Sequence, residues 1–60
     1  MTELSTPHPA AQAFNAGNAA YKQNDWPQAL ALYEQALQHD AQLVPAWLQK
    51  ARCLVLLAQY

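Results

Sequence analysis

Apolar residues recur at steps of three and four in three stretches of this chain, and only short breaks separate the stretches. The first stretch covers residues 10–23 and carries Ala13, Phe14, Gly17, Ala20 and Tyr21 at this spacing. Because an α-helix turns once every ~3.6 residues, these side chains lie on one side of a helix. Short connections make consecutive helices antiparallel neighbours, so the spacing predicts an antiparallel helical fold.

The breaks carry residues that end one helix and start the next. Asn24 tolerates the left-handed geometry of a helix end, and Asp25 can cap the helix that follows. Proline suits a first helical turn, where Pro27 and Pro45 stand in the second and third helices. No stretch alternates as a strand does, so the predicted fold class is all-α with three helices. Their expected bounds are near 10–23, 27–39 and 44–58.

The charges and reactive residues exclude several classes of function. No nucleic-acid partner is expected from a net charge of −1 and three cations, Lys22, Lys50 and Arg52. Cys53, the single cysteine, excludes an internal disulfide, and we expect a small buried residue rather than a reactive thiol. His8 and His39 have no cysteine or carboxylate at ligand spacing, and no phosphate loop or nucleophile motif is present. We therefore expect no metal, no cofactor and no catalysis by this chain alone.

The first residues carry no recognisable targeting signal. Residues 1–8 lack periodicity and are predicted to be a flexible N-terminal tail before a folded segment at 9–60. They also lack the positive and apolar regions of a signal peptide, and no apolar run approaches the ~20 residues that cross a bilayer. We expect no membrane partner and a cytoplasmic location. The richness in alanine, glutamine and leucine points to a bacterial source.

A shift of 34 residues relates the first helix to the third. It places Phe14 on Leu48, Gly17 on Ala51, Ala20 on Leu54 and Trp26 on Tyr60, with matching size classes but no identities. The stretch "GNAAYKQNDWPQALALYEQALQHD" closely resembles the tetratricopeptide repeat, a 34-residue helix–turn–helix. The residues that carry the resemblance are Gly17, Asn18, Trp26, Ala29, Tyr33, Ala36 and Leu37, followed in the next unit by Trp47, Ala51 and Leu54.

The resemblance implies a fragment of an α-solenoid. Repeat 1 covers about residues 10–43, and the first helix of repeat 2 covers about 44–60. Gly17 and Ala29 have almost no side chain, so they should let the two antiparallel helices of repeat 1 approach closely. The chain departs from the family pattern at Asn24, where glycine is usual, and at Lys50, where an aliphatic residue is usual.

The resemblance also implies a function, because the first helices of such repeats line a concave groove where peptides lie. The groove candidates are Phe14, Asn18, Tyr21, Leu48, Gln49, Arg52 and Val55. Asn18 can bond a peptide backbone and Arg52 can hold a carboxylate, although both could simply be solvated. Some members clamp a C-terminal carboxylate with a lysine at the place of Phe14, so here a ligand with apolar side chains is expected.

The expected function is therefore a non-catalytic module that binds a peptide or partner protein. Two alternatives remain open. The chain could be the N-terminal repeat segment of a larger enzyme, for example a transferase, or it could be a self-assembling structural module.

The last ten residues, "ARCLVLLAQY", are strongly apolar, so we expect another element to bury their side chains. In the repeat register, one face with Trp47, Ala51 and Leu54 should meet a second helix of its own unit. We expect either a chain that continues past Tyr60 or two copies that cover each other, and no stable monomer at micromolar concentration. The self-association candidates are Leu54, Leu56, Leu57 and Tyr60.

Overall fold

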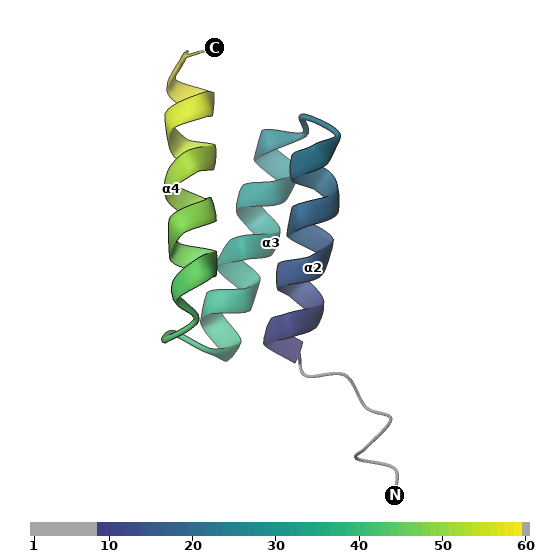
Figure 1. The fold of residues 1–60 in the computed structure, drawn as a ribbon, viewed down its shortest axis with the longest axis vertical. Helices are drawn as coiled ribbons and strands as arrows, with labels where there is room; N and C mark the ends of the chain where they lie inside the picture. Colours follow the sequence, from purple (N-terminus) through teal and green to yellow (C-terminus); the bar gives the residue numbers. More distant parts are fainter. Residues whose placement is uncertain (1–8, 60) are drawn as a thin grey trace, which may run out of the picture.

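The computed structural model describes residues 9–59, which form three helices joined by short turns (Figure 1). The helices are α2 (Pro9–Lys22), α3 (Trp26–His39) and α4 (Val44–Gln59). The described residues contain no strand. The prediction of an all-α fold with three helices is confirmed, and each bound lies within one residue of its expected place. The predicted flexible tail at 1–8 lies outside the described residues.

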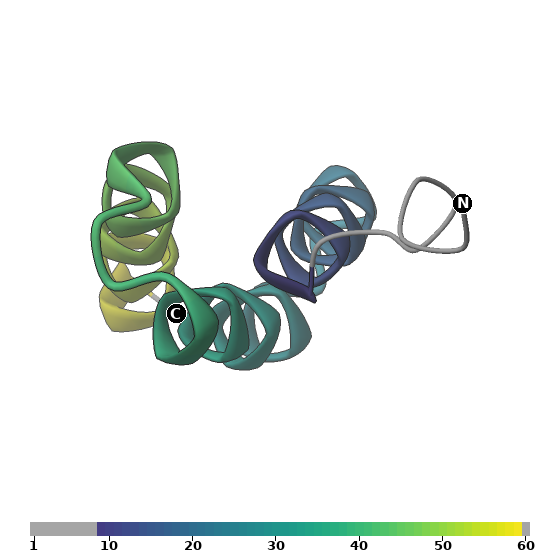
Figure 2. The same ribbon diagram turned by 90° about the horizontal axis from the view of Figure 1, so that it is seen from below.

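The helix α3 is central, because α2 and α4 both pack against it and hardly contact each other. Viewed along the helices, α2 and α4 stand on the same side of α3 (Figure 2). Consecutive helices run antiparallel, so α2 and α4 point the same way. Their shared side, opposite α3, is the face that the viewer sees in Figure 1.

The turn between α2 and α3 has the geometry that the sequence predicts. Asn24 adopts a left-handed backbone with φ 62°, and its N–H donates to the carbonyl of Tyr21 at 3.0 Å. The side chain of Asp25 accepts a hydrogen bond from the N–H of Gln28 at 3.4 Å, which caps the start of α3. These local bonds satisfy backbone groups that each helix end leaves without a partner in the helix.

Small residues set the distance between α2 and α3. The buried residues of α2 are Ala10, Ala13, Gly17 and Ala20, and those of α3 are Ala29, Tyr33, Ala36 and Leu37. A Cβ atom placed on Gly17 would lie 2.8 Å from Cε1 of Tyr33, closer than carbon atoms ordinarily approach. The expected close approach at Gly17 is therefore present, and the ring of Tyr33 is what approaches it.

The third helix packs on α3 through a narrow strip. Its buried residues are Ala46 and Cys53, both fully buried. The connection before it is fixed by Asp40, whose side chain accepts from the N–H of Gln42 at 3.1 Å. The indole Nε1 of Trp47 donates to the carbonyl of Ala41 at 2.7 Å, which ties the start of α4 to this loop.

Candidate binding face

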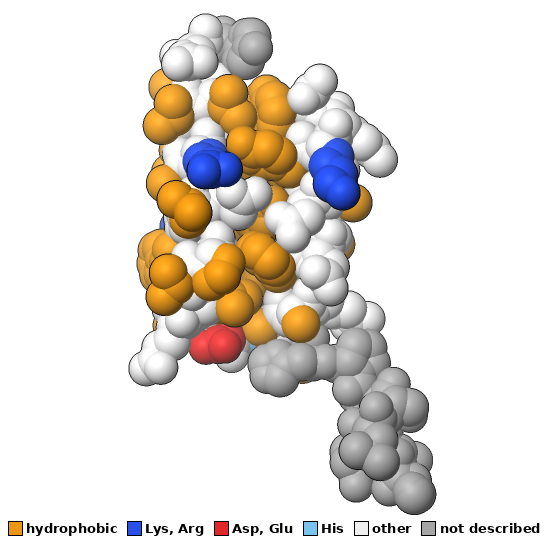
Figure 3. Space-filling model, viewed as in Figure 1, with side chains coloured by type: hydrophobic (Ala, Val, Ile, Leu, Met, Phe, Trp, Pro, Cys, Tyr) orange, Lys and Arg blue, Asp and Glu red, His pale blue; other side chains and the backbone are white. Residues whose placement is uncertain are grey.

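The side of the molecule shared by α2 and α4 carries the predicted groove residues, and we call it the α2–α4 face. Its members are Phe14, Asn18, Tyr21, Leu48, Gln49, Arg52 and Val55. The α2 members and Gln49 are half-buried, whereas the other three α4 members are exposed. Figure 3 shows an apolar surface on this side of the molecule, with cationic side chains on both flanks.

A chain of hydrogen bonds crosses this face from one outer helix to the other. Arg52 Nη1 donates to Gln49 Oε1 at 3.5 Å, and Gln49 Nε2 donates to the Tyr33 hydroxyl at 3.3 Å. The same hydroxyl donates to Asn18 Oδ1 at 2.5 Å. Asn18 of repeat 1 is thus joined to Gln49 and Arg52 of repeat 2 through Tyr33 of α3, and the first three are predicted groove residues.

Tyr33 is the member of this network that the groove prediction omits. The sequence places it on the apolar stripe of α3, where only its ring is expected to matter. Burial raises the pKa of the Tyr33 phenol, and the hydrogen bond from Gln49 opposes that effect. The hydroxyl therefore keeps its proton at neutral pH and can donate to Asn18. An apolar ring would fill the same space, so the presence of a tyrosine at this position is the sequence signal for a hydroxyl that forms hydrogen bonds.

The bond from Tyr33 decides what Asn18 offers a ligand. An asparagine amide has one oxygen that accepts and one nitrogen that donates twice. The oxygen has two lone pairs, and one of them already accepts from the Tyr33 hydroxyl, so the two N–H donors are the larger part of the amide that a ligand can use. A group that accepts hydrogen bonds, such as a peptide carbonyl, matches this arrangement.

Aromatic contacts hold the α2 side of the face in place. The ring of Phe14 lies 5.7 Å from that of Tyr33 in a tilted arrangement. The ring of Tyr21 meets that of Trp26 edge-on at 5.0 Å. Ring pairs at these distances attract each other, so Phe14 and Tyr21 have restricted freedom before any ligand arrives.

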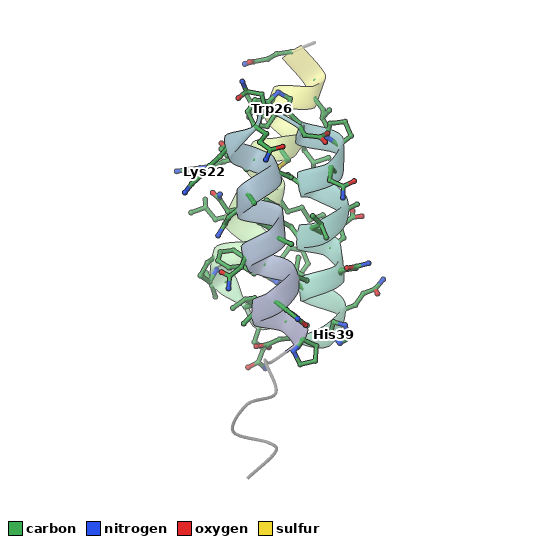
Figure 4. All side chains as sticks on the ribbon, turned by 90° about the vertical axis from the view of Figure 1, so that its right-hand side faces the viewer. Lys22, Trp26 and His39 are labelled. Carbon is green, nitrogen blue, oxygen red and sulfur yellow. The ribbon has the colours of Figure 1, made fainter. Side chains whose placement is uncertain are left out.

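The cations of the described residues are divided between two sides of the molecule. Lys22 and Arg52 are both exposed. In Figure 4, Lys22 points to the left, the side that faces the viewer in Figure 3. Lys50 instead lies 3.7 Å from Glu34 and 5.2 Å from the centre of the Trp47 ring. Lys22 is not among the predicted groove residues, although it follows Asn18 by one helical turn.

The remaining reactive residues do not join this face. Cys53 is fully buried, and burial raises the pKa of its thiol, which suppresses the reactive thiolate. His39 lies at the end of α3, on the opposite side from Lys22 in Figure 4. Within residues 9–59, no three His, Cys, Asp or Glu side chains form a group that could hold a metal ion. No helix there is long and apolar enough to cross a membrane.

The self-association candidates differ in exposure. Leu54 is 48% exposed, whereas Leu56 and Leu57 are half-buried, and Tyr60 lies outside the described residues. Val44 is 70% exposed and is not among the predicted candidates. Val44 stands three residues before Trp47, so it continues the spacing of Trp47, Ala51 and Leu54, and this spacing is the signal that could have found it.

Comparison with known proteins identifies the repeat. A family model described as the tetratricopeptide repeat matches residues 20–60, which is more than half of the chain. The comparisons with curated proteins and with solved structures gave no match. The matched region contains α3, α4 and the turn between α2 and α3, the parts whose packing is described above. Repeats of this kind generally serve as protein-interaction modules. The chain belongs to the tetratricopeptide repeat family.

Proposed function

We propose that the α2–α4 face binds an extended segment of a partner protein, and that this segment carries apolar side chains and an acidic group. The observation that supports this is the hydrogen-bonded chain Arg52–Gln49–Tyr33–Asn18, which lies among exposed apolar side chains. These hydrogen-bonded side chains fix the orientation of a bound backbone, and the apolar side chains around them bury apolar surface of the segment.

Each part of the face has a role in this proposal. The amide nitrogen of Asn18 donates to a carbonyl of the bound segment. Arg52 uses one of its N–H donors in the hydrogen bond to Gln49, and the remaining donors of its planar guanidinium are available to a carboxylate. The exposed side chains of Leu48 and Val55 cover the apolar side chains of the segment. Each large side chain buried in this way contributes about 1.5–3 kcal/mol before the cost of ordering the segment.

The charges favour an acidic segment. Lys22 and Arg52 are exposed, whereas Glu34 is paired with Lys50, and Asp25 and Asp40 accept hydrogen bonds from backbone N–H groups. The acidic surface visible in Figure 3 lies at the lower end of this side, away from the cations in its upper part. A carboxylate near Lys22 and Arg52 is attracted by both. Binding should therefore weaken as salt is raised, because exposed charges are screened within ~10 Å at 0.1 M.

Selection from a displayed library of random linear peptides tests the proposal. The immobilised chain should enrich peptides that combine large apolar residues with aspartate or glutamate. The double variant Asn18→Ala, Arg52→Ala should bind an enriched peptide at least about tenfold more weakly, because two charge-assisted or buried hydrogen bonds are lost.

A matched control keeps the number of substitutions equal. Gln35→Ala, Gln38→Ala changes two exposed residues on the far side of α3 and should bind like the wild type. Circular dichroism must show the same helicity in all three proteins. Equal binding by the groove variant and the wild type, or no enrichment at all, would remove the assignment of this face.

A further inference from the structure

Three side-chain hydrogen bonds cross the α2–α4 face, and all three run in one direction. Arg52 Nη1 donates to Gln49 Oε1, and Gln49 Nε2 donates to the Tyr33 hydroxyl. That hydroxyl then donates to Asn18 Oδ1. We call this series of bonds the relay. Each middle member accepts at one atom and donates from another, so the direction of one bond fixes the direction of the next.

Arg52 fixes this direction at the α4 end. A guanidinium carries only N–H donors, so the atom of Gln49 that bonds it must be the acceptor, Oε1. The two residues are three positions apart on α4, a spacing that brings helix side chains together. The oxygen and nitrogen of the Gln49 amide lie at different ends of a planar group, so the nitrogen is left to face Tyr33. The opposite orientation of this amide would point N–H groups at the guanidinium and lose the bond.

The Tyr33 hydroxyl passes the direction on to α2. A hydroxyl has a single proton to donate, and because Gln49 donates to this one, the proton is available to Asn18. Burial raises the pKa of the Tyr33 phenol, and the hydrogen bond from Gln49 lowers it, which is the effect of a bond donated to the phenol oxygen. The ring is fully buried, so it holds the hydroxyl between the two amides.

We propose that Arg52 is a positioning residue, which acts through the relay to turn the amide donors of Asn18 toward the bound segment. This role rests on the function proposed for the α2–α4 face, and it adds a rule for the ligand. The group that meets Asn18 is an acceptor because the residue at position 52 is a donor. An acceptor-only residue at position 52, such as glutamate, reverses all three bonds. Asn18 then donates to Tyr33 and turns its oxygen toward the ligand.

The relay is the route that joins the two ends of the face. Asn18 lies on α2 and Arg52 on α4, and these two helices hardly contact each other. Tyr33 lies between them on α3, which packs against both. An effect of position 52 on the orientation of the Asn18 amide therefore passes through Tyr33 and Gln49. Cutting the relay at Gln49 should abolish that effect.

NMR spectra of the free chain test the relay without a ligand. In the wild type the relay uses only the oxygen of the Asn18 amide, so both protons on Nδ2 should exchange rapidly with water. In Arg52→Glu one of these protons should shift downfield and exchange more slowly, because it bonds the Tyr33 oxygen. Arg52→Lys keeps a donor-only residue at position 52 and should retain the wild-type signals.

The matched control makes the same change of charge with the relay cut. In a Gln49→Leu background, Asn18 should give the same signals with arginine or glutamate at position 52. Circular dichroism must show equal helicity in all variants. Unaltered Asn18 signals in Arg52→Glu would overturn the proposal. An equal change in the Gln49→Leu background, or an Arg52→Lys protein that behaves like Arg52→Glu, would overturn it as well.

A peptide enriched on the α2–α4 face tests the rule for the ligand. Each backbone amide of the peptide is replaced in turn by an ester, whose carbonyl is a weaker acceptor. A replacement that weakens binding to the wild type but not to Asn18→Ala marks the carbonyl that Asn18 binds. At that position the loss should be about threefold or more for the wild type and Arg52→Lys, and absent for Arg52→Glu. Comparing both peptides on the same protein cancels the carboxylate contact of Arg52.

The two tests fail separately. A selection that enriches no peptide removes the function proposed for the face, and the spectra still decide whether the relay orients Asn18. An ester scan in which no position depends on Asn18 would overturn the rule for the ligand. So would an equal ester effect in the wild type and in an Arg52→Glu protein whose spectra show the reversed relay.

Discussion

Gly17 lies against the ring of Tyr33, and replacing it with alanine sets two effects of similar size against each other. Glycine in the middle of a helix costs about 1 kcal/mol relative to alanine, so the helix alone would gain from the change. The new Cβ atom, however, would lie 2.8 Å from Cε1 and 2.9 Å from Cδ1 of Tyr33. The outcome depends on whether the ring can move.

The contacts of Tyr33 indicate that the ring cannot move cheaply. Ordinary contact between carbon atoms is about 3.5–4.0 Å, so the ring would have to retreat by roughly 0.7 Å or more. Tyr33 is fully buried, and its hydroxyl is hydrogen-bonded to Asn18 and Gln49. Overpacking of this kind costs about 1–3 kcal/mol. We expect a net loss of about 1 kcal/mol for Gly17→Ala, and a loss at least as large for Gly17→Leu.

Thermal unfolding followed by circular dichroism measures this loss. A change of about 1 kcal/mol should lower the Tm of so small a domain by roughly 4–8 °C. All proteins must be compared at one concentration, since self-association makes the Tm concentration-dependent. Asn15→Ala, at an exposed place on the same helix, gains helix propensity without a packing change and should raise the Tm.

A double-mutant cycle identifies the ring as the cause. In a Tyr33→Leu background the clash is gone, so Gly17→Ala should stabilise the protein by about the helix-propensity gain of 1 kcal/mol. A Gly17→Ala protein that is as much stabilised as Asn15→Ala in the wild-type background would refute the packing argument.

Three further changes test other parts of the structure. Tyr33→Phe removes the hydroxyl shared by Asn18 and Gln49 and should lower the unfolding free energy by about 1 kcal/mol in a denaturant titration, where an unchanged midpoint would contradict the two bonds. Asn24→Val forces a β-branched residue to φ 62° and should cost about 1–2 kcal/mol, whereas Asn24→Gly should cost a few tenths at most; equal stabilities would contradict the turn. Burial raises the pKa of Cys53 above the 9.0 of a free thiol, so the unfolded chain loses this proton first and stability should fall as pH rises through 9. Cys53→Ala should reduce that decline, and an equal decline in both proteins would contradict the buried thiol.

The helices and turns could be predicted because their signals are local. The left-handed turn depends on Asn24 and the cap on Asp25, and both act within a few residues along the chain. The spacing of Ala29 and Tyr33 likewise fixes which side of the helix turns inward, whatever packs there. The relation of Asn18 to Arg52 is also visible in the sequence, because it depends only on the length of the repeat. Signals of these kinds do not depend on how the helices meet in space.

The hydrogen-bond network could not be predicted, because it depends on how three helices meet. Tyr33 and Gln49 are 16 residues apart, and Tyr33 and Asn18 are 15 apart. Neither separation has a periodic signature, and a tyrosine on an apolar stripe shows only that a hydroxyl is present, not which residues that hydroxyl will bond. The ion pair between Lys50 and Glu34 is the same kind of case, since Lys50 appears in the sequence only as a departure from the family pattern.

Tyr33 connects the packing of the repeat to the chemistry of its binding face. Its ring fills the space that Gly17 leaves open, and its hydroxyl orients Asn18 and Gln49 on the surface. A change that displaces the ring therefore also displaces the hydroxyl, and with it the two amides. Stability and binding are thus coupled at this residue. A smaller core residue in its place would relax the Gly17 contact, but it would also remove the hydroxyl that joins Asn18 of α2 to Gln49 of α4.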